Sequence, residues 1–216
     1  GTRMAIAFAQ EAERLGAAGL LLMPPYLAEG SQAGLRAHII ALCKATRLGV
    51  IVYNRANCRL TVETLLRLAE DCPNLIGFKD GVGDIAQLVA IRSALGDRVA
   101  YLNGMPTAET YAPAFSSIGM PTYSSAIFNF IPRTAIRFHR AIHDGDQATV
   151  DSLMNSFLVP YVRLRGRQPG YAVSIVKAGA KIVGRNAGPV RSPLSELTPP
   201  EYDELAALIA QLGPQD

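Results

Sequence analysis

Apolar positions along the chain follow two patterns that alternate. In one pattern they recur at helical spacing, as Val62, Leu66 and Ala69 do within residues 61–71. The other pattern is a short, nearly continuous apolar run, which is typical of a strand buried on both faces of a sheet. Each helical segment leads into one such run. The predicted helix–strand pairs are 2–16 with 18–23, 32–46 with 48–53, 61–71 with 75–78, 84–95 with 99–102, and 106–116 with 120–123.

After residue 123 the apolar runs stop and helical patterns continue to the end. The predicted helices cover 132–144, 147–164, 171–183 and 200–212. Thr198 is the expected N-cap of the last one, because Pro199 and Glu201 follow at the positions of a capping box. We therefore predict a partial barrel carrying the active site over 1–130. Residues 131–216 are predicted to form the last barrel helix and a helical extension.

The alternation of helix and strand predicts a parallel sheet with right-handed crossovers, for which two architectures exist. An open doubly wound sheet gathers its site at one switch point, and the dinucleotide fingerprint of such sheets is absent from this sequence. A (β/α)8 TIM barrel builds its site from the ends of many strands. Polar or reactive residues follow every predicted strand, which favours the barrel. They are Pro24-Pro25-Tyr26, Tyr53-Asn54, Lys79-Asp80, Asn103-Gly104 and Tyr123-Ser124-Ser125.

Composition narrows the class of protein. Apolar residues make up 49% of the 216-residue chain, enough for a large core, and the net charge of +3 carries no long basic run. A nucleic acid partner is therefore not expected, and no apolar stretch has the length of about 18 residues that a membrane span needs. The three cysteines match no metal motif and suit a reducing compartment, so we expect a cytoplasmic protein without a membrane partner.

Lys79 carries the main chemical hypothesis, because it ends the apolar run 75–78. An amine at the mouth of a buried strand loses hydration, which lowers its pKa, and a neutral amine can attack a ketone to form a Schiff base. The alternative is a lysine whose stem packs at the strand end while its ammonium group reaches water. Lys177 and Lys181, one helical turn apart, are expected at the surface or at an interface.

Tyr53 ends the preceding strand, so in a barrel it would lie close to Lys79 and could shuttle a proton. An aromatic ring that closes the barrel end is the alternative. Asn54 follows as a candidate substrate-binding residue. Arg55 or Arg59 could hold a substrate carboxylate through a bidentate pair, or either could be a surface arginine.

Asn103, Ser124 and Ser125 complete the candidate substrate-binding set, since their amide and hydroxyl groups suit sugar hydroxyls or a carboxylate. Local capping of the strand ends is the alternative for these short side chains. No nucleophile elbow supports a serine hydrolase. His139 and His143 lie four residues apart but lack the glutamate of a zinc protease, so we expect no metal site.

The segments 50–54 (Val-Ile-Val-Tyr-Asn) and 77–80 (Gly-Phe-Lys-Asp) resemble the Tyr and Schiff-base Lys motifs of the dihydrodipicolinate synthase/N-acetylneuraminate lyase superfamily. Residues 24–26, Asn103-Gly104 and the late motif 188–193 are also similar to that family, and the likeness runs over essentially the whole chain. The resemblance implies a catalytic Lys79 with Tyr53 as its partner.

Within the family, residues 53–57, 77–84 and 123–129 are most similar to the dehydratases that act on 5-dehydro-4-deoxyglucarate. Aldolase-like members usually have Tyr-Asn-x-Pro where this chain has Arg55-Ala56. The resemblance implies a decarboxylating dehydration of a keto sugar diacid to 2,5-dioxopentanoate, without metal or organic cofactor, in a homotetramer. Another Schiff-base aldolase or synthase of the family, or an inactive fragment, remains as the alternative.

The resemblance also implies that the predicted strands correspond to strands four to eight of an eight-stranded barrel. The chain opens inside a helical pattern, with Met4, Phe8 and Leu15 on one face. We therefore expect N-terminal strands, with the family's carboxylate-binding Thr or Ser pair, to be missing from this sequence.

Overall fold

The computed structural model describes residues 1–25 and 29–215, so Tyr26 of the first strand-end motif lies outside the described residues. The chain forms two compact units. Unit 1 comprises Gly1–Met105 and Phe115–Thr122, and unit 2 comprises Pro106–Ala114 and Tyr123–Asp216. The predicted division near residue 130 separates barrel from extension, and it stays a prediction.

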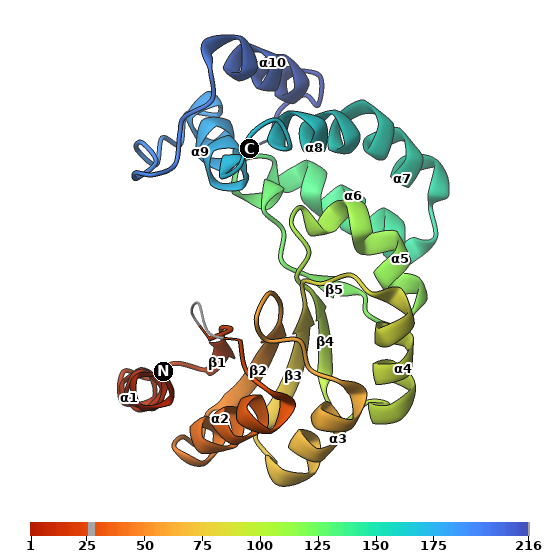
Figure 1. Cartoon of the computed structure of the whole chain (residues 1–216). Coiled ribbons are helices and arrows are strands. Elements are labelled where there is room, and N and C mark those ends of the chain that lie inside the picture. Colours follow the sequence, from red (N-terminus) through yellow and green to blue (C-terminus); the bar gives the residue numbers. More distant parts are fainter. Residues whose placement is uncertain (26–28, 216) are drawn as a thin grey trace. The chain divides into compact units, whose positions relative to one another are not determined.

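Unit 1 is built around a parallel sheet whose strand order, over the described residues, is β1-β2-β3-β4-β5 (Figure 1). Parallel pairing joins β1 to β2, β2 to β3 and β3 to β4. This confirms the predicted α/β fold. The strand bounds are β1 (Gly19–Leu22), β2 (Gly49–Asn54), β3 (Leu75–Asp80), β4 (Ala100–Asn103) and β5 (Thr122–Tyr123), the last of which spans the boundary between the units.

Helices α2, α3 and α4 lie along one face of this sheet (Figure 1), as right-handed crossovers between strands in sequential order require. Side chains alternate along each strand, so every second residue joins the core beneath the helices. Val50, Val52, Leu75 and Phe78 are fully buried there. The helix bounds are α1 (Thr2–Arg14), α2 (Gln32–Lys44), α3 (Val62–Asp71), α4 (Ile85–Leu95) and α5 (Ala112–Ser117).

The sheet is less enclosed than the apolar runs predicted. Strands buried on both faces were expected, but Leu21 of β1 and Ile76 of β3 are exposed by 43% and 47%. Ile76 is skipped in the pairing of β2 with β3, where the register shifts as in a β-bulge. Met4 and Phe8 of α1, and Leu15 at its C-cap, are also exposed. The expectation of strands buried on both faces is therefore wrong at Leu21 and Ile76 of the described chain.

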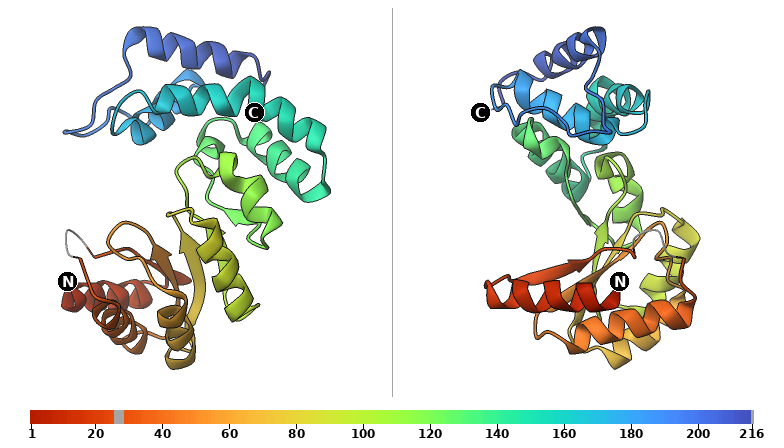
Figure 2. Two further views of the ribbon diagram at one scale, coloured as in Figure 1. Left: turned by 45° about the vertical axis from the view of Figure 1, so that its right-hand side comes forward. Right: turned by 60° about the vertical axis from the view of Figure 1, so that its left-hand side comes forward.

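Unit 2 is helical, as predicted, and Figure 2 shows its helices from two further sides. Its core contains aliphatic and aromatic side chains, among which the ring of Tyr161 contacts those of Phe130 and Phe157. Thr198 and Glu201 form the predicted capping box. The predicted helix 147–164 is continuous but contains one π-helical turn, η3. The bounds are η1 (Ala108–Tyr111), η2 (Ile127–Asn129), α6 (Pro132–Asp144), α7 (Gln147–Leu153), η3 (Met154–Leu158), α8 (Val159–Arg165), α9 (Tyr171–Ile182) and α10 (Pro199–Ala210).

Cys43, Cys58 and Cys72 are free thiols buried in the core of unit 1. Burial raises the pKa of the Cys43 thiol to about 12 and that of Cys58 to about 11. Such thiols stay protonated and unreactive at neutral pH. Over the described residues, no helix is both long enough and apolar enough to cross a membrane.

Candidate functional site

The predicted catalytic residues are register partners on neighbouring strands. Tyr53 of β2 pairs with Lys79 of β3, and the next pair along is Asn54 with Asp80. Because side chains alternate, Tyr53 and Lys79 lie on the sheet face away from α2–α4, whereas Asn54 and Asp80 point toward the helices. The two strands therefore bring together the pair that the sequence predicted, at the carboxyl end of the sheet.

Lys79 is half-buried, and its Nζ atom lies 5.0 Å from the centroid of the Tyr53 ring. Burial lowers the pKa of the Lys79 ammonium group, and the positive charge of Arg55 lowers it further. Both effects favour the neutral amine, which is the form that attacks a carbonyl carbon. The geometry and the charge of the site thus suit an imine-forming lysine.

The Tyr53 hydroxyl is held from two sides. It donates a hydrogen bond to the carbonyl oxygen of Gly104 at 2.7 Å and accepts one from Nη1 of Arg55 at 3.0 Å. The guanidinium carbon of Arg55 lies 5.8 Å from the centroid of the same ring. The phenol is therefore fixed beside Lys79, with an arginine oriented toward the same place.

Gly81 and Gly104 have no side chains, and this gives Lys79 and Tyr53 the space that they occupy. A Cβ atom on Gly104 would lie 2.8 Å from both Cε and Cγ of Lys79 and 2.8 Å from a ring carbon of Tyr53. A Cβ atom on Gly81 would lie 3.0 Å from the Tyr53 hydroxyl. Glycine is needed at 104 because the backbone passes directly against both side chains.

Asn54 and Asp80 form a fully buried pair on the helix side of the sheet. Nδ2 of Asn54 donates to Oδ1 of Asp80 at 2.7 Å, and Oδ1 of Asn54 accepts from the backbone of Leu60 at 2.9 Å. Oδ2 of Asp80 accepts from the backbone amide groups of Val82 and Gly83. Asn54 therefore ties together the loops that follow β2 and β3.

Asn103 is placed in the same way at the end of β4. It is fully buried, pairs with Asp80 in the sheet register and accepts a hydrogen bond from the backbone of Met105 through Oδ1. The structure gives Asn54 and Asn103 structural contacts on the helix side, and their predicted contact with substrate stays a prediction.

Arg55 sits in a tight turn that directs its side chain back over Tyr53. Its backbone pairs with Cys58, and Ala56 between them has a left-handed φ of 48°. An L-residue in this conformation is strained, and such strain is found where the surroundings fix a functional side chain. Arg59 is exposed, and its backbone carbonyl oxygen accepts a hydrogen bond from the side chain of Gln32.

Ser124 and Ser125 belong to unit 2, directly after β5. The Ser125 hydroxyl oxygen accepts a hydrogen bond from the backbone amide of Phe128, a residue of the short helix η2, at 3.1 Å. This hydrogen bond leaves the hydroxyl hydrogen of Ser125 available to a second group. The predicted contact of Ser125 with substrate stays a prediction.

Glu109 was not singled out from the sequence, yet it is the most deeply buried carboxyl group described, with no exposed area. It lies on η1 in unit 2. A glutamate within a predicted helix is normally on the solvated face, so helical periodicity does not indicate that Glu109 is buried.

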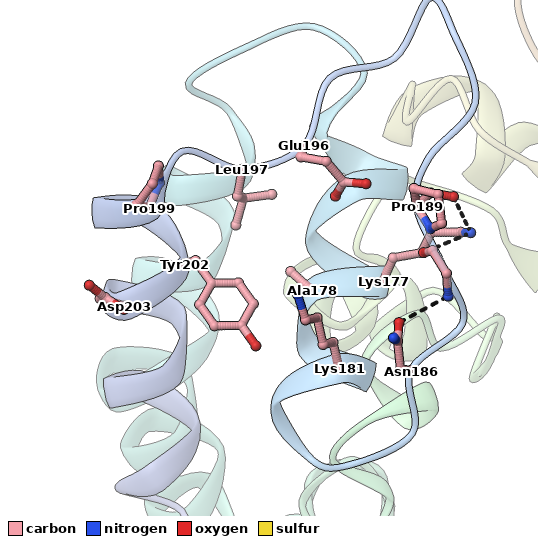
Figure 3. A pocket seen from close by; sticks show the side chains of 11 residues that line it. Lys177, Ala178, Lys181, Asn186, Pro189, Glu196, Leu197, Pro199, Tyr202 and Asp203 are labelled. Atoms are coloured by element: carbon pink, nitrogen blue, oxygen red, sulfur yellow. Dashed lines mark hydrogen bonds between the residues drawn. The ribbon is translucent and has the colours of Figure 1, made fainter.

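A cavity of about 700 Å³ in unit 2 contains the other two lysines that the sequence raised (Figure 3). Nζ of Lys177 donates to the carbonyl oxygens of Ala187, Gly188 and Pro189, so its three hydrogens hold residues 187–189, at the start of the motif 188–193, against α9. Nζ of Lys181 lies 5.6 Å from the centroid of the Tyr202 ring. These contacts give Lys177 a structural task within unit 2.

His139 and His143 stack with ring centroids 6.2 Å apart, and Tyr123 packs edge-on against His139. Among the residues that the structure describes, no group of three or more His, Cys, Asp or Glu side chains is placed to hold a metal ion.

Comparison with known proteins places these residues in a family. The model of the dihydrodipicolinate synthetase family matches residues 1–212. A protein of Leptothrix cholodnii named probable 5-dehydro-4-deoxyglucarate dehydratase is 61% identical over all of this chain and 71% of its own length. A protein of the same name from Pseudomonas putida is 60% identical over 99% of this chain and 71% of its own length.

Solved structures of dihydrodipicolinate synthases are also similar to this chain. Dihydrodipicolinate synthase from Oceanobacillus iheyensis superposes with a TM-score of 0.87 at 25% identity, over 98% of this chain and 70% of the other. The 4-hydroxy-tetrahydrodipicolinate synthase of Methylacidiphilum fumariolicum gives a TM-score of 0.83 at 27% identity, over 98% and 69% of the two chains. The fold, the paired Tyr53 and Lys79 and these likenesses agree, and the chain belongs to the dihydrodipicolinate synthetase family.

Proposed function

We propose that the protein is a Schiff-base lyase that converts 5-dehydro-4-deoxy-D-glucarate into 2,5-dioxopentanoate, carbon dioxide and water. The observation that carries this proposal is Lys79, a lysine of lowered pKa held beside the Tyr53 phenol. The choice of substrate rests on relatives about 60% identical over nearly the whole chain that bear the name of this dehydratase.

The reaction begins with the neutral amine of Lys79, which attacks the keto carbon next to one carboxylate and releases water to form a protonated imine. A proton then leaves the adjacent CH₂ carbon, and its electron pair is delocalised into the imine. The hydroxyl group on the following carbon departs as water after protonation, leaving a double bond conjugated with the imine. Lys79 thus supplies the electron sink for the dehydration.

Decarboxylation follows from the same conjugation. The far carboxylate leaves as carbon dioxide, and the electrons of its carbon–carbon bond pass through the conjugated system to the imine nitrogen. Protonation on carbon and conversion of the resulting enol to an aldehyde give the product, which hydrolysis releases from Lys79. The water used here equals the water lost on imine formation, so the net products are 2,5-dioxopentanoate, one carbon dioxide and one water.

Tyr53 serves as the proton carrier in this scheme. Its hydroxyl hydrogen points to the carbonyl oxygen of Gly104 in the free protein, so bound substrate must redirect it toward the leaving hydroxyl. Arg55 donates to the phenol through Nη1, and its remaining N–H groups can bind a substrate carboxylate. Asn54, Asn103, Ser124 and Ser125 would orient the diacid or hold the loops that do.

The complete barrel, the oligomeric state and the cellular location are also proposals. We infer that the described sheet is part of a (β/α)8 barrel, since the sheet face bearing Tyr53 and Lys79 would then line the barrel interior. The TM-scores to dihydrodipicolinate synthases support this inference. A homotetramer is supported by the family resemblance, and a cytoplasmic site by the three buried free thiols.

Borohydride trapping tests the proposed function. The protein is mixed with 5-dehydro-4-deoxyglucarate and sodium borohydride, and the reduced adduct is located by peptide mass spectrometry. We expect the adduct on Lys79, none in Lys79→Ala, and a normal adduct in Lys44→Ala, which removes an exposed lysine of α2. Normal turnover by Lys79→Ala would overturn the mechanism.

A product assay separates the proposal from its alternative within the family. Release of carbon dioxide with 2,5-dioxopentanoate marks the decarboxylating dehydratase. Release of pyruvate from a 2-keto-3-deoxy sugar acid marks an aldolase instead. Because aldolase and dehydratase share the Lys79 imine, only the products distinguish them.

A further inference from the structure

Glu109 places a carboxyl group in the interior of unit 2 without a visible partner. The residue has no exposed area, and neither carboxyl oxygen has a hydrogen-bond partner within the described residues. Burying an ionised carboxylate in this way costs several kcal/mol, which a protein avoids by keeping the group protonated. The structure therefore contains a buried acid that the proposed reaction does not use.

The turn that carries Glu109 inward is strained and anchored. Thr107, two residues earlier, has a left-handed φ of 52° and is buried. Nη1 of Arg165 on α8 donates to the Thr107 hydroxyl oxygen at 2.8 Å. Strain held by a specific contact indicates that the direction of the following side chain matters to the protein.

The groups that face Glu109 come from the end of β5 and from α8. The Ser125 hydroxyl and the backbone amide of Ile127 lie close enough to influence its pKa, but neither is in hydrogen-bond geometry with it. Tyr123 and Tyr161 are close enough that a negative charge on Glu109 would raise the pKa of both phenols. Arg165 and His139, which packs on Tyr123, are the nearby groups that titrate or carry charge.

Ser125 needs a second partner in this arrangement. Its oxygen already accepts a hydrogen bond from Phe128, so its hydrogen remains to be donated. Glu109 is the acceptor that faces it. Burial is the largest cause that raises the pKa of the Glu109 carboxyl, and Ser125 opposes this rise, as a donor to the carboxyl does.

We propose that Glu109 is a neutral, protonated acid that positions the Ser125 hydroxyl and keeps the end of β5 free of negative charge for a dianionic substrate. This rests on the proposed function, in which Ser125 contacts the diacid. An ionised Glu109 near Ser125 would repel a substrate with two carboxylates, whereas the neutral acid accepts from Ser125 without repulsion. Glu109 is thus a positioning residue, separate from the imine chemistry of Lys79.

The test compares Glu109→Gln, a neutral residue of the same shape, with Glu109→Leu, an apolar residue of similar volume. Glu70→Gln on the exposed end of α3 is the control. At neutral pH we expect the infrared carbonyl band of a protonated carboxyl group in the parent and in Glu70→Gln. The band should be absent from both Glu109 variants.

Steady-state kinetics gives the functional readout. We expect Glu109→Gln to keep the KM of the parent within about twofold, and Glu109→Leu to raise KM roughly tenfold, as loss of one hydrogen bond does, with kcat little changed. In the parent, KM should rise at alkaline pH as Glu109 ionises. That rise should disappear in Glu109→Gln.

Several outcomes would overturn the proposal. They are an ionised Glu109 at neutral pH, a Glu109→Leu variant with the KM of the parent, or an alkaline rise of KM that survives in Glu109→Gln. If Glu109→Leu does not fold, the pH profile of Glu109→Gln decides. Borohydride trapping at Lys79 is run alongside, since a parent that forms no adduct refutes the proposed function, whereas an adduct with unchanged KM in the variants refutes only the role of Glu109.

Discussion

Nζ of Lys79 lies 5.0 Å from the centroid of the Tyr53 ring, and the two residues are register partners on adjacent parallel strands. The phenol is anchored to the backbone of Gly104 and to Arg55, so it cannot swing away from the lysine without breaking both contacts. The sheet itself, and not a mobile loop, therefore sets the distance between the imine-forming amine and its proton carrier.

Tyr53→Phe should lower kcat by roughly 10²- to 10⁴-fold, the usual contribution of a general acid or base. The ring still packs beside Lys79, so borohydride trapping of substrate should persist, only more slowly. Stopped-flow and steady-state assays measure the two effects. A kcat within about threefold of the parent would exclude Tyr53 as the proton carrier.

Gly104→Ala should disturb the site more than the fold. Its Cβ atom would meet Lys79 and Tyr53 at 2.8 Å, and a displacement of about 1 Å at reacting groups can cost about 10²-fold in rate. The control is Gly34→Ala on α2, where the nearest atom would be Ser31 Oγ at 3.4 Å. We expect kcat to fall only in Gly104→Ala. Equal activity of the two variants would contradict this view of the site.

Arg55→Gln should shift the pH dependence of the reaction. The charge of Arg55 lowers the pKa of Lys79, so its removal raises that pKa and leaves less neutral amine at a given pH. The acidic limb of the profile of kcat/KM should therefore move to higher pH. Arg59→Gln, with the same loss of charge at an exposed position, should leave the limb in place. A limb that stays unmoved in Arg55→Gln would show that another group controls it.

Asn54→Leu should destabilise the fold, because it leaves Oδ1 of Asp80 and the amide of Leu60 buried without their partner. We expect a loss of about 2–4 kcal/mol in the free energy of unfolding, measured from urea titrations at constant m-value. Asn57→Ala in the turn that follows should change it by less than about 0.5 kcal/mol. A loss below about 1 kcal/mol would mean that the Asn54–Asp80 contact contributes little.

Sequence patterns predicted most of the fold and the centre of the site. Helical periodicity and apolar runs located the strands to within a few residues, and Lys79 and Tyr53 stood out because both end such runs. The pattern could not say which face of the sheet each strand-end residue occupies. Tyr53 and Asn54 are adjacent in sequence, but the alternation of a strand sends one beside Lys79 and the other beneath the helices.

Other features depended on tertiary contacts that no local pattern contains. Gly104 is required only because Lys79 and Tyr53 pass directly against it. Glu109 lies in a segment with ordinary helical spacing, and its burial follows a left-handed turn at Thr107 that periodicity does not indicate. The exposed apolar side chains of α1 and β1 could not be foreseen either, since periodicity predicts an apolar face but not what covers it.

The register of β2 against β3 determines which insertions and deletions the site can tolerate. An insertion or deletion in the loops around α3 changes the number of residues between Tyr53 and Lys79 but leaves the pairing of β2 with β3 intact. A single residue inserted within β2 or β3, by contrast, would turn one of the two side chains to the opposite face of the sheet. Homologues that keep this chemistry are therefore free to vary the interval between the two residues, and a search that fixes the interval instead of the strand alignment will overlook them.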